Sequence, residues 1–586
     1  MKKRLVSLLL VMVMAVSVLA GCSKDEPAPS TDDNKVTDAP VVDDNKGGDT
    51  VDTPATTDAP VVTDAPVVDT DEVTEFTFFI TMPGAEINSD NEIAEMIADK
   101  WGVRVKETWL TGQTASEATG TLIAGDSYTD FIDSDEMNML VEANALIALD
   151  DYIDQYPEFR DTWFTKEEWD KFRQPDGHIY WINPFQNTYG TPRPTTHNDE
   201  AFWIQCRALE FAGYPEVQTL DDYFDVIEKY VAANPETNGA ANIGYTILCE
   251  DWRYFCIENA GQFLAGYPND GSVIVNKSTM TIEDYNTSED TKLYLKKLNE
   301  EYKKGIVDPE SFTQTYDEYI AKLSTGRVIG MCDQWWDFSN DVESSFKTQG
   351  LDLIGCNYVP FGLTTTAGME NRWHTYGDTV NQASGIAITK DCQDVDKAFW
   401  FLVQCAMDQE LHDLRFWGVK DVDYCVDENG LFYRTEEQRM NAADSTYKAQ
   451  HLCAYSYFPQ WGGTSRDGKN AMNPSEQPSE FMANMAEPLK KTFEAYGAGS
   501  YPEMIGSVVE ENGPWFPMYS YSNNFTTATP GGLAFSLMGE IKHEWLPKVV
   551  MAEDFEASYA EYMEVYNGIN PQDFLAEMQA ILDTFK

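Results

Sequence analysis

Apolar positions near the start of the folded part switch between the period of a strand and that of a helix. A short apolar run at 76–80 precedes four apolar residues at helical spacing within 93–101, and alternation returns at 103–109. Ser89 and Glu92 have the spacing of a capping box before that helix. A strand, helix and strand in this order predict a parallel sheet covered by helices, the α/β class.

The same helical pattern recurs further along the chain. Thr219 and Asp222 precede apolar residues at helical spacing within 223–230, and another such run covers 295–302. The region 73–586 exceeds the size of a usual single domain. The sequence therefore predicts at least two α/β domains.

The N-terminus has the pattern of an export signal. Three basic residues at 2–4 precede the apolar run Leu5–Leu19, which is too short to span a bilayer comfortably. The run ends in Leu19–Cys22, which resembles a bacterial lipobox. We therefore expect a signal peptide over 1–21 and a lipid anchor on Cys22, with an ordinary signal peptide and an incidental cysteine as the alternative. No later stretch has the length and apolarity of a membrane span.

Residues 22–72 differ in composition from the rest of the chain. They are rich in Asp, Thr, Pro and Val, and the hexamer Thr-Asp-Ala-Pro-Val-Val starts at Thr37, Thr57 and Thr63. A segment with so few large apolar side chains cannot bury a core. We interpret it as an acidic, disordered tether between the anchor and the folded part.

The composition indicates which kinds of partner the chain is suited to bind. The formal charge of −57 disfavours nucleic acid and anionic membrane surfaces. The 15 Trp and 30 Tyr favour carbohydrate, because aromatic faces stack on sugar rings. The ten cysteines are scattered, which argues against a disulfide framework, although a Cys249–Cys256 pair stays open.

Motifs of catalysis or metal binding are not found. The six His show no HExxH spacing, and the chain has no GxSxG, Walker A or GxGxxG motif. Asp421–Gly430 is acidic but lacks the EF-hand spacing, and we interpret it as a solvated turn. The sequence predicts no catalytic residue, metal or cofactor, although a carboxylate pair of a glycosidase cannot be recognised by inspection.

Seven short motifs follow one another in the order found in family 1 extracellular solute-binding proteins, especially the lipoproteins of Gram-positive sugar importers. The chain resembles that family in the segments Leu122–Asp126 with Asp130–Ile132, Leu149–Ile153, Asp176–Tyr180, Ala208–Leu220, Gly305–Glu310, Leu323–Val328 and Gly418–Gly430. Two departures are Thr129 where the family has Pro, and Ile204–Arg207 where it has Arg-Lys-Asp-Trp.

The resemblance implies a two-lobed periplasmic-binding-protein-like fold with hinge-connected lobes and a ligand held between them. It further implies a monomeric receptor on the extracellular face of the membrane that takes a sugar or oligosaccharide and meets the permease subunits of an ABC importer. We expect the N-terminal lobe to comprise 73–190 with 330–385, and the C-terminal lobe 191–329 with 386–586.

Ligand-binding candidates are clusters of Trp with polar residues. Aromatic platforms hold ring faces, and Asp or Arg side chains bind hydroxyls. Either ring of the pair at 335 and 336 can instead belong to the core. The candidates are Asp333, Trp335, Trp336, Asp251, Trp252, Arg253, Trp373, Tyr376, Asp378, Trp461 and Trp515.

Two other functions remain open from the sequence. A surface enzyme that degrades polysaccharides would share the anchor, the acidity and the many Trp residues. A peptide-binding transport receptor would share the fold with less need for Trp.

Overall fold

The computed structural model describes residues 68–84, 91–185, 195–268, 272–376, 382, 384–452, 455–465, 467–506, 509–510 and 513–586. The expected signal peptide, Cys22, the tether up to residue 67, Ser89 and Asp378 lie outside the described residues. Within the described ranges, the helices are all too short or too polar to cross a bilayer.

The first sheet has the strand order β2-β1-β3-β14-β4. Strands β1 (Thr74–Pro83), β2 (Val103–Leu110) and β3 (Phe131–Asp133) are parallel, and β14 (Ile386–Ile388) runs antiparallel between β3 and β4 (Trp181–Ile182). Helix α2 (Glu92–Trp101) connects β1 to β2, as the periodicity predicts. Its N-cap is Asn91, whose side chain accepts a hydrogen bond from Ala94 N, so the capping box at Ser89 is wrong.

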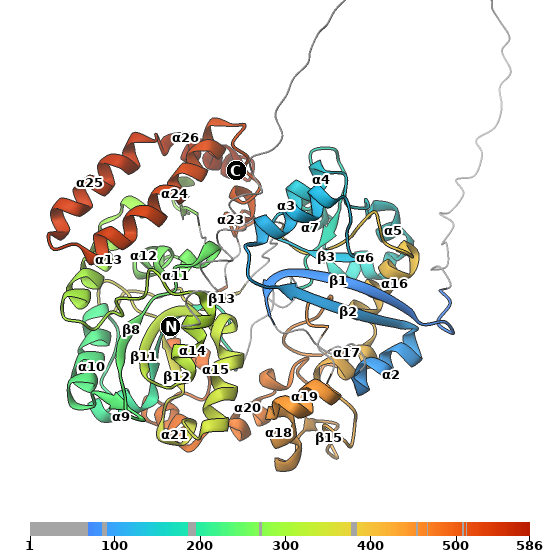
Figure 1. Cartoon of the computed structure of the whole chain (residues 1–586), viewed down its shortest axis with the longest axis horizontal. Helices are drawn as coiled ribbons and strands as arrows, with labels where there is room; N and C mark the ends of the chain where they lie inside the picture. Colours follow the sequence, from blue (N-terminus) through green and yellow to red (C-terminus); the bar gives the residue numbers. More distant parts are fainter. Residues whose placement is uncertain are drawn as a thin grey trace, which may run out of the picture. The chain divides into compact units, whose positions relative to one another are not determined.

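Helices from two parts of the chain surround this sheet (Figure 1). Its buried core combines residues of 76–182 with residues of 386–411 and with Tyr455 and Phe458. The helices are α3 (Ala115–Gly125), α4 (Met137–Glu142), α5 (Asp150–Gln155), α6 (Pro157–Trp163), α7 (Lys166–Lys171), α16 (Val395–Met407), α17 (Gln409–Phe416), α18 (Glu436–Ala443) and α19 (Ser445–His451), with the hairpin β15 (Cys425–Val426) and β16 (Phe432–Tyr433).

The second sheet has the strand order β12-β5-β11-β8. Strand β11 (Val328–Gln334) is parallel to β8 (Ile243–Thr246) and antiparallel to β5 (Glu200–Gln205), which also pairs with β12 (Tyr358–Phe361). Helix α10 (Leu220–Ala233) begins with the predicted capping box between Thr219 and Asp222. The other elements before residue 377 are α9 (Cys206–Ala212), β6 (Glu236–Thr237), β7 (Ala240–Ala241), η1 (Asp251–Tyr254), α11 (Phe255–Glu258), α12 (Ala260–Leu264), β9 (Ile274–Asn276), β10 (Thr281–Glu283), η2 (Tyr285–Thr287), α13 (Glu289–Lys303), α14 (Tyr316–Ser324), α15 (Trp335–Gln349), η3 (Asp352–Ile354) and β13 (Thr375–Tyr376).

The C-terminal part of the chain joins the second core. Buried residues within 485–582 belong to the same apolar cluster as the second sheet. The long helix α24 (Pro530–Met551) packs against α13, α25 (Phe555–Gly568) and α26 (Gln572–Asp583). Helices α24, α25 and α26 are drawn in red in Figure 1. Shorter elements precede it, namely η4 (Pro474–Glu476), α20 (Pro478–Asn484), α21 (Glu487–Tyr496), α22 (Tyr501–Ile505), β17 (Val509–Glu510) and α23 (Tyr519–Ser522).

Each of the two cores defines one lobe. The residues found in each core show that the expected lobe boundaries are wrong. Residues 330–361 belong to the second lobe, because β11 and β12 form ladders with β5. Residues 386–458 belong to the first lobe, because β14 forms a ladder with β3 and the following helices share its core. The order of the core residues means that the chain passes between the lobes three times, between 182 and 201, between 373 and 386, and between 458 and 485.

Candidate functional site

Three strand ends supply the polar and aromatic residues of the candidate site. Strand β3 of the first lobe ends at Asp133, and the parallel strands β8 and β11 of the second lobe end at Thr246 and Gln334. In open α/β sheets, ligands bind at the carboxyl ends of parallel strands. The residues just beyond these three ends are therefore the first place to look for a site.

The side chains of Trp252 and Trp336 form a stacked pair beyond β8 and β11. Their ring centroids lie 5.9 Å apart with an interplanar angle of 10°. Both side chains are half-buried, and the indole Nε1 of Trp336 donates a hydrogen bond to Oε1 of Gln334. The structure thus brings together two residues that the sequence predicts as platforms from separate clusters.

Arg253 supports this pair from the protein side. Its guanidinium lies 4.4 Å from the ring centroid of Trp252 and 4.0 Å from that of Tyr316. Its Nε donates to both carboxylate oxygens of Asp337, at 3.0 and 3.1 Å. Burial raises the pKa of the Asp337 carboxyl, and the Arg253 charge offsets this rise only in part. Both partners of this ion pair are buried. The pair holds the guanidinium in place, and the Trp252 ring packs against that guanidinium.

Asp333 is buried and Trp335 is half-buried, and both make contacts within the second lobe. The Asp333 carboxylate is fully buried and accepts hydrogen bonds from Tyr319 Oη at 2.6 Å and from Gln334 N at 2.7 Å. Burial and the nearby Asp337 charge raise its pKa well above the usual value. Trp335 packs against Trp203 and Tyr501, with ring centroids 4.9 Å away in each case. Both residues therefore hold the end of β11 in place.

Asp251 precedes Trp252 in the second lobe, and its charge acts on Asp135 of the first lobe. Asp251 is exposed and has a φ of 52°, a left-handed conformation that costs a non-glycine residue energy and recurs at functional positions. Asp135 follows β3 and is also exposed. The protein surrounding it and the charges of Glu136 and Asp251 raise its pKa, while a hydrogen bond from Ser384 and the charge of Arg253 oppose the rise.

Sequence reasoning misses Asp135, although a signal exists. Asp133 ends strand β3, directly behind the motif Asp130–Ile132 that the sequence identifies, and Asp135 follows two residues later. Asp133 is buried, and burial together with the charge of Asp135 raises its pKa to about 8. The signal in the sequence is an acidic residue just beyond the end of a strand, where ligands of open α/β sheets bind.

Among the predicted residues that the structure describes, Trp373 and Trp461 lie apart from the ring pair. Trp373 is 1% exposed, stacks on Phe263 with centroids 4.1 Å apart, and donates from Nε1 to Leu363 O at 2.7 Å, so it is a core residue. Trp461 packs edge-on against Trp163 in the first lobe and donates from Nε1 to Ala406 O. The backbone of Tyr376 in β13 pairs with β17.

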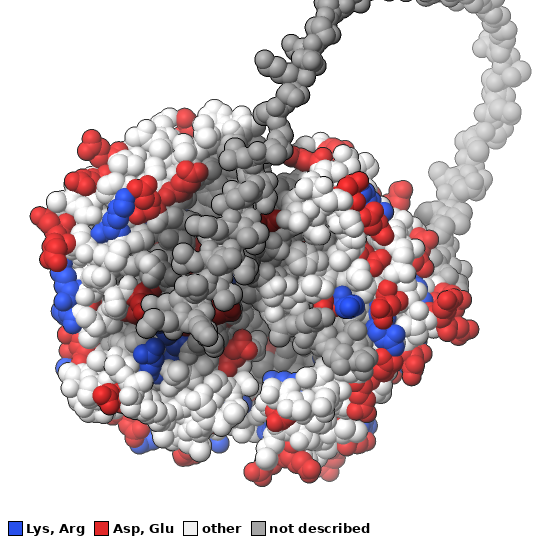
Figure 2. Space-filling view, in the orientation of Figure 1, with Lys and Arg blue, Asp and Glu red and all other residues white. Residues whose placement is uncertain are grey.

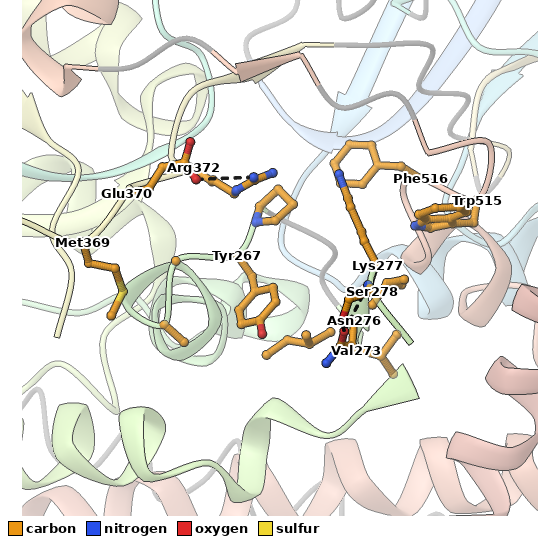
Figure 3. A pocket seen from close by; sticks show the side chains of 15 residues that line it. Tyr267, Val273, Asn276, Lys277, Ser278, Met369, Glu370, Arg372, Trp515 and Phe516 are labelled. Carbon is orange, nitrogen blue, oxygen red and sulfur yellow. Dashed lines mark hydrogen bonds and ion pairs between the residues drawn. The ribbon is translucent and has the colours of Figure 1, made fainter. Parts of the chain in front are cut away.

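Trp515 lines a separate pocket of about 380 Å³ in the second lobe. Figure 3 shows Trp515 and Phe516 on one side, with Arg372 and Glu370 on the other and Tyr267 between them. Lys277 contributes a second basic side chain to the wall, and Arg372 Nη2 lies 3.5 Å from Glu370 Oε2. This pocket thus combines aromatic rings with cationic groups.

The acidic segment 421–430 forms local contacts. Asp427 Oδ1 accepts hydrogen bonds from the backbone amides of Asn429 and Leu431, as in a turn. Among the residues that the structure describes, none form a group of three or more His, Cys, Asp or Glu with the arrangement of a metal site. Cys249 and Cys256 are buried, free thiols, so the disulfide left open by the sequence is not formed.

Two α/β lobes joined by three chain crossings define the periplasmic-binding-protein-like fold of extracellular solute-binding proteins, which confirms the fold class expected from the motifs. No protein-family model matches the sequence. The chain is 30% identical over 294 residues to the fructooligosaccharide ABC transporter substrate-binding protein FusA of Streptococcus pneumoniae serotype 4. This match covers 43% of the chain and 52% of the relative, so the chain spans about half the length of the curated relative it matches.

Solved structures resemble the fold over most of the chain. The S. pneumoniae FusA complex with kestose has a TM-score of 0.57 at 15% identity, covering 87% of this chain and 99% of that one. A solute-binding protein of Bifidobacterium longum infantis described as binding HMO has a TM-score of 0.56 at 14% identity, covering 88% and 99%. The alginate-binding protein AlgQ2 has a TM-score of 0.54 at 15% identity, covering 88% and 98%.

Proposed function

We propose that this chain is the substrate-binding protein of an ABC importer and that it captures a sugar or oligosaccharide between its two lobes. The observation that carries the proposal is the Trp252–Trp336 stack at the carboxyl ends of β8 and β11, with the exposed Asp251 next to Trp252 in the chain. Indole faces bind the apolar faces of sugar rings, and carboxylates accept hydrogen bonds from hydroxyls.

The comparisons support the same proposal. FusA is named as a receptor for fructooligosaccharides, and structural relatives are described as binding kestose or alginate. From the sequence we further propose that the chain carries an export signal and is anchored by lipid through Cys22 on the extracellular face of the membrane. We also propose that it is a monomer and that its partners are the permease subunits. In this function the chain returns its ligand unchanged and acts as no enzyme.

A thermal-shift screen of the purified protein against mono- and oligosaccharides, with peptides as controls, tests the proposal. A ligand that binds only the folded state raises the midpoint by mass action. For the saccharide that does so, Trp336→Ala should weaken binding by about 1–3 kcal/mol, because a truncated platform loses its stacking contact. Trp400→Ala, on α16 of the first lobe, is the matched control and should leave the affinity unchanged.

Each other outcome points to a different function. Stabilisation by peptides alone would favour a peptide-binding transport receptor. Cleavage of the saccharide during the screen would favour a polysaccharide-degrading enzyme. An unchanged affinity in Trp336→Ala would remove the ring pair from the binding site.

A further inference from the structure

The Trp515 pocket brings three aromatic rings of the second lobe to one cavity. Tyr267 follows helix α12, Trp515 and Phe516 precede α23, and all three line the same volume of about 380 Å³ (Figure 3). Ligand pockets range from about 300 to 1,000 Å³ and combine aromatic walls with a few polar groups. The cavity lies at the lower end of this range, which suits one or two sugar units.

Close backbone packing holds the walls of the cavity in place. Gly266 has a φ of 80°, and a Cβ atom there would lie 3.1 Å from Glu370 O, so these two wall segments approach each other closely. A Cβ atom at Gly513 would lie 2.5 Å from the Trp515 ring. Trp515 and Phe516 are 9% and 7% exposed, so the surrounding protein fixes their orientation. A wall that is ordered before the ligand arrives loses little freedom on binding.

The charged groups of the pocket differ from those of the surrounding surface. Acidic side chains predominate on the face in Figure 2, whereas the described lining residues of the pocket combine Glu370 with Arg372 and Lys277. Arg372 Nη2 lies 3.5 Å from Glu370 Oε2, and Lys277 is exposed to solvent, where salt screens its charge. A guanidinium has five N–H donors and a carboxylate only acceptors, so the pair can bind hydroxyls without requiring a charge on the ligand.

The loop that carries Trp515 adjoins a contact between the lobes. Lys171 Nζ, at the end of α7 in the first lobe, donates a hydrogen bond to Pro514 O at 3.4 Å. Gln382, in the second chain crossing, donates from Nε2 to Ser520 O at 3.0 Å, a few residues beyond Trp515. This wall of the pocket therefore lies on the side of the second lobe that contacts the first, as a subsite of an interlobe receptor requires.

We propose that the Trp515 pocket is a second saccharide site, distinct from the Trp252–Trp336 pair, and that it holds one or two neutral sugar units. The three aromatic rings contact the apolar face of the sugar, and the side chains of Arg372 and Glu370 bind its hydroxyls. The described residues that line the pocket include neither ring of the pair nor the ends of β8 and β11. The inference rests on the proposed function and adds a binding site to it.

Fluorine NMR of the purified protein labelled with 5-fluorotryptophan observes the two sites separately. The resonances of Trp336 and Trp515 are assigned by their loss in Trp336→Phe and Trp515→Phe. Titration uses maltose, cellobiose, lactose, sucrose and any oligosaccharide that the thermal-shift screen identifies. A saccharide should shift the Trp515 resonance until the site is saturated, and this shift should persist in Trp336→Ala. Arg372→Gln should weaken the response by at least ~10-fold, because a hydrogen bond from a charged donor is lost.

Arg327→Gln is the matched control, because it makes the same substitution just before β11, at the opposite end of that strand from Trp336. It should leave the response of Trp515 unchanged. A response of Trp515 without one of Trp336 would support the inference and remove the ring pair from the binding site.

Three results would overturn the inference. If the Trp515 resonance stays fixed while Trp336 responds, the pocket binds no saccharide and the proposed function stands. If the Trp515 shift vanishes in Trp336→Ala at every saccharide concentration, or keeps its full affinity in Arg372→Gln, the signal comes from binding elsewhere. If neither resonance responds to any saccharide, the proposed function fails and the inference with it.

Discussion

The two lobes differ in how a buried carboxylate interacts with a nearby arginine. In the second lobe, Arg253 and Asp337 are joined by direct hydrogen bonds at 3.0 and 3.1 Å, directly behind the Trp252 ring. In the first lobe, Glu107 on β2 is 1% exposed, and among the described residues neither of its carboxylate oxygens has a hydrogen-bond partner. Arg415 acts on Glu107 electrostatically, yet donates its hydrogen bonds to four backbone carbonyls.

This difference shows what a buried charge does in each lobe. A paired and hydrogen-bonded charge costs little net energy and can hold a neighbouring ring in one orientation. An unpaired buried carboxyl instead takes up a proton as its pKa rises. We infer that the second lobe uses its pair to position the candidate site, whereas the first lobe carries a group that makes its stability depend on pH.

The largest effect is expected on breaking the pair in the second lobe. Arg253→Met keeps most of the side-chain volume but leaves Asp337 charged, buried and alone. Removing one partner of such a pair typically costs about 3–5 kcal/mol of unfolding free energy. Urea denaturation followed by Trp fluorescence measures this loss.

The double variant Arg253→Met/Asp337→Asn is the matched control for that experiment. It should recover more than half of the loss, because the buried charge is gone. A loss below about 1 kcal/mol in the single variant would show that water or a neighbouring group stabilises Asp337, and the contrast between the lobes would disappear.

The adjacent pair at 335 and 336 shows why the sequence locates this region but not the contacts within it. Successive residues of a helix point about 100° apart, so only one of the two rings can face the core. Helix α15 starts at Trp335, and this start directs Trp335 toward Trp203 and leaves Trp336 beside Trp252. The sequence gives the pair, whereas the choice between its members depends on where the helix begins.

The local sequence pattern does not predict which strands pair with one another in a sheet. Strand β11 is a short, almost fully buried run, and its antiparallel partner β5 lies more than 120 residues earlier in the chain, at Gly330 with Ile204 and Gln334 with Glu200. Periodicity predicts that such a strand exists without naming the strand beside it. The helix at 220–233 begins at its predicted capping box, and the helix at 92–101 forms over the predicted apolar spacing, although Asn91 caps it instead of Ser89.

A smaller effect is expected from removing the unpaired carboxyl in the first lobe. Burial raises the pKa of Glu107 to about 7, and Arg415 opposes this only in part. The folded state therefore holds a proton that the unfolded chain has released, and this group lowers stability as pH rises from about 4.5 to about 7. Glu107→Gln should be more stable than the parent by about 1–3 kcal/mol at pH 8 and equal to it near pH 4.

Urea denaturation at both pH values checks this expectation, with Glu561→Gln on α25 as the exposed control. A gain that stays constant with pH would show that the amide forms new hydrogen bonds and that the charge of Glu107 is not the cause. Such a result would remove the first half of the comparison between the lobes.

The smallest effect concerns a paired group in the first lobe, where the opposite sign of pH dependence is expected. His451 on α19 lies between two carboxylates, with Nδ1 at 2.5 Å from Glu92 Oε2 and Nε2 at 2.8 Å from Asp423 Oδ2. Burial lowers the pKa of His451, but the hydrogen bonds and charges of Asp423 and Glu92 raise it above the usual value. The stabilising contribution is thus full below about pH 6.5, the unfolded value, and is lost as pH rises through the higher folded value.

In the Glu107→Gln background, where that group no longer titrates, denaturation at pH 6 and pH 9 should show a loss of about 1 kcal/mol that is absent after His451→Gln, because glutamine carries no titrating charge. Double variants with Glu107→Gln separate the two groups, since the sites lie on different elements and their effects should add. If His451→Gln keeps the full pH-dependent loss, the imidazole stays neutral between its two carboxylates. The first lobe would then contain no charged pair comparable to Arg253 and Asp337 at this position, and the contrast between the lobes would become sharper.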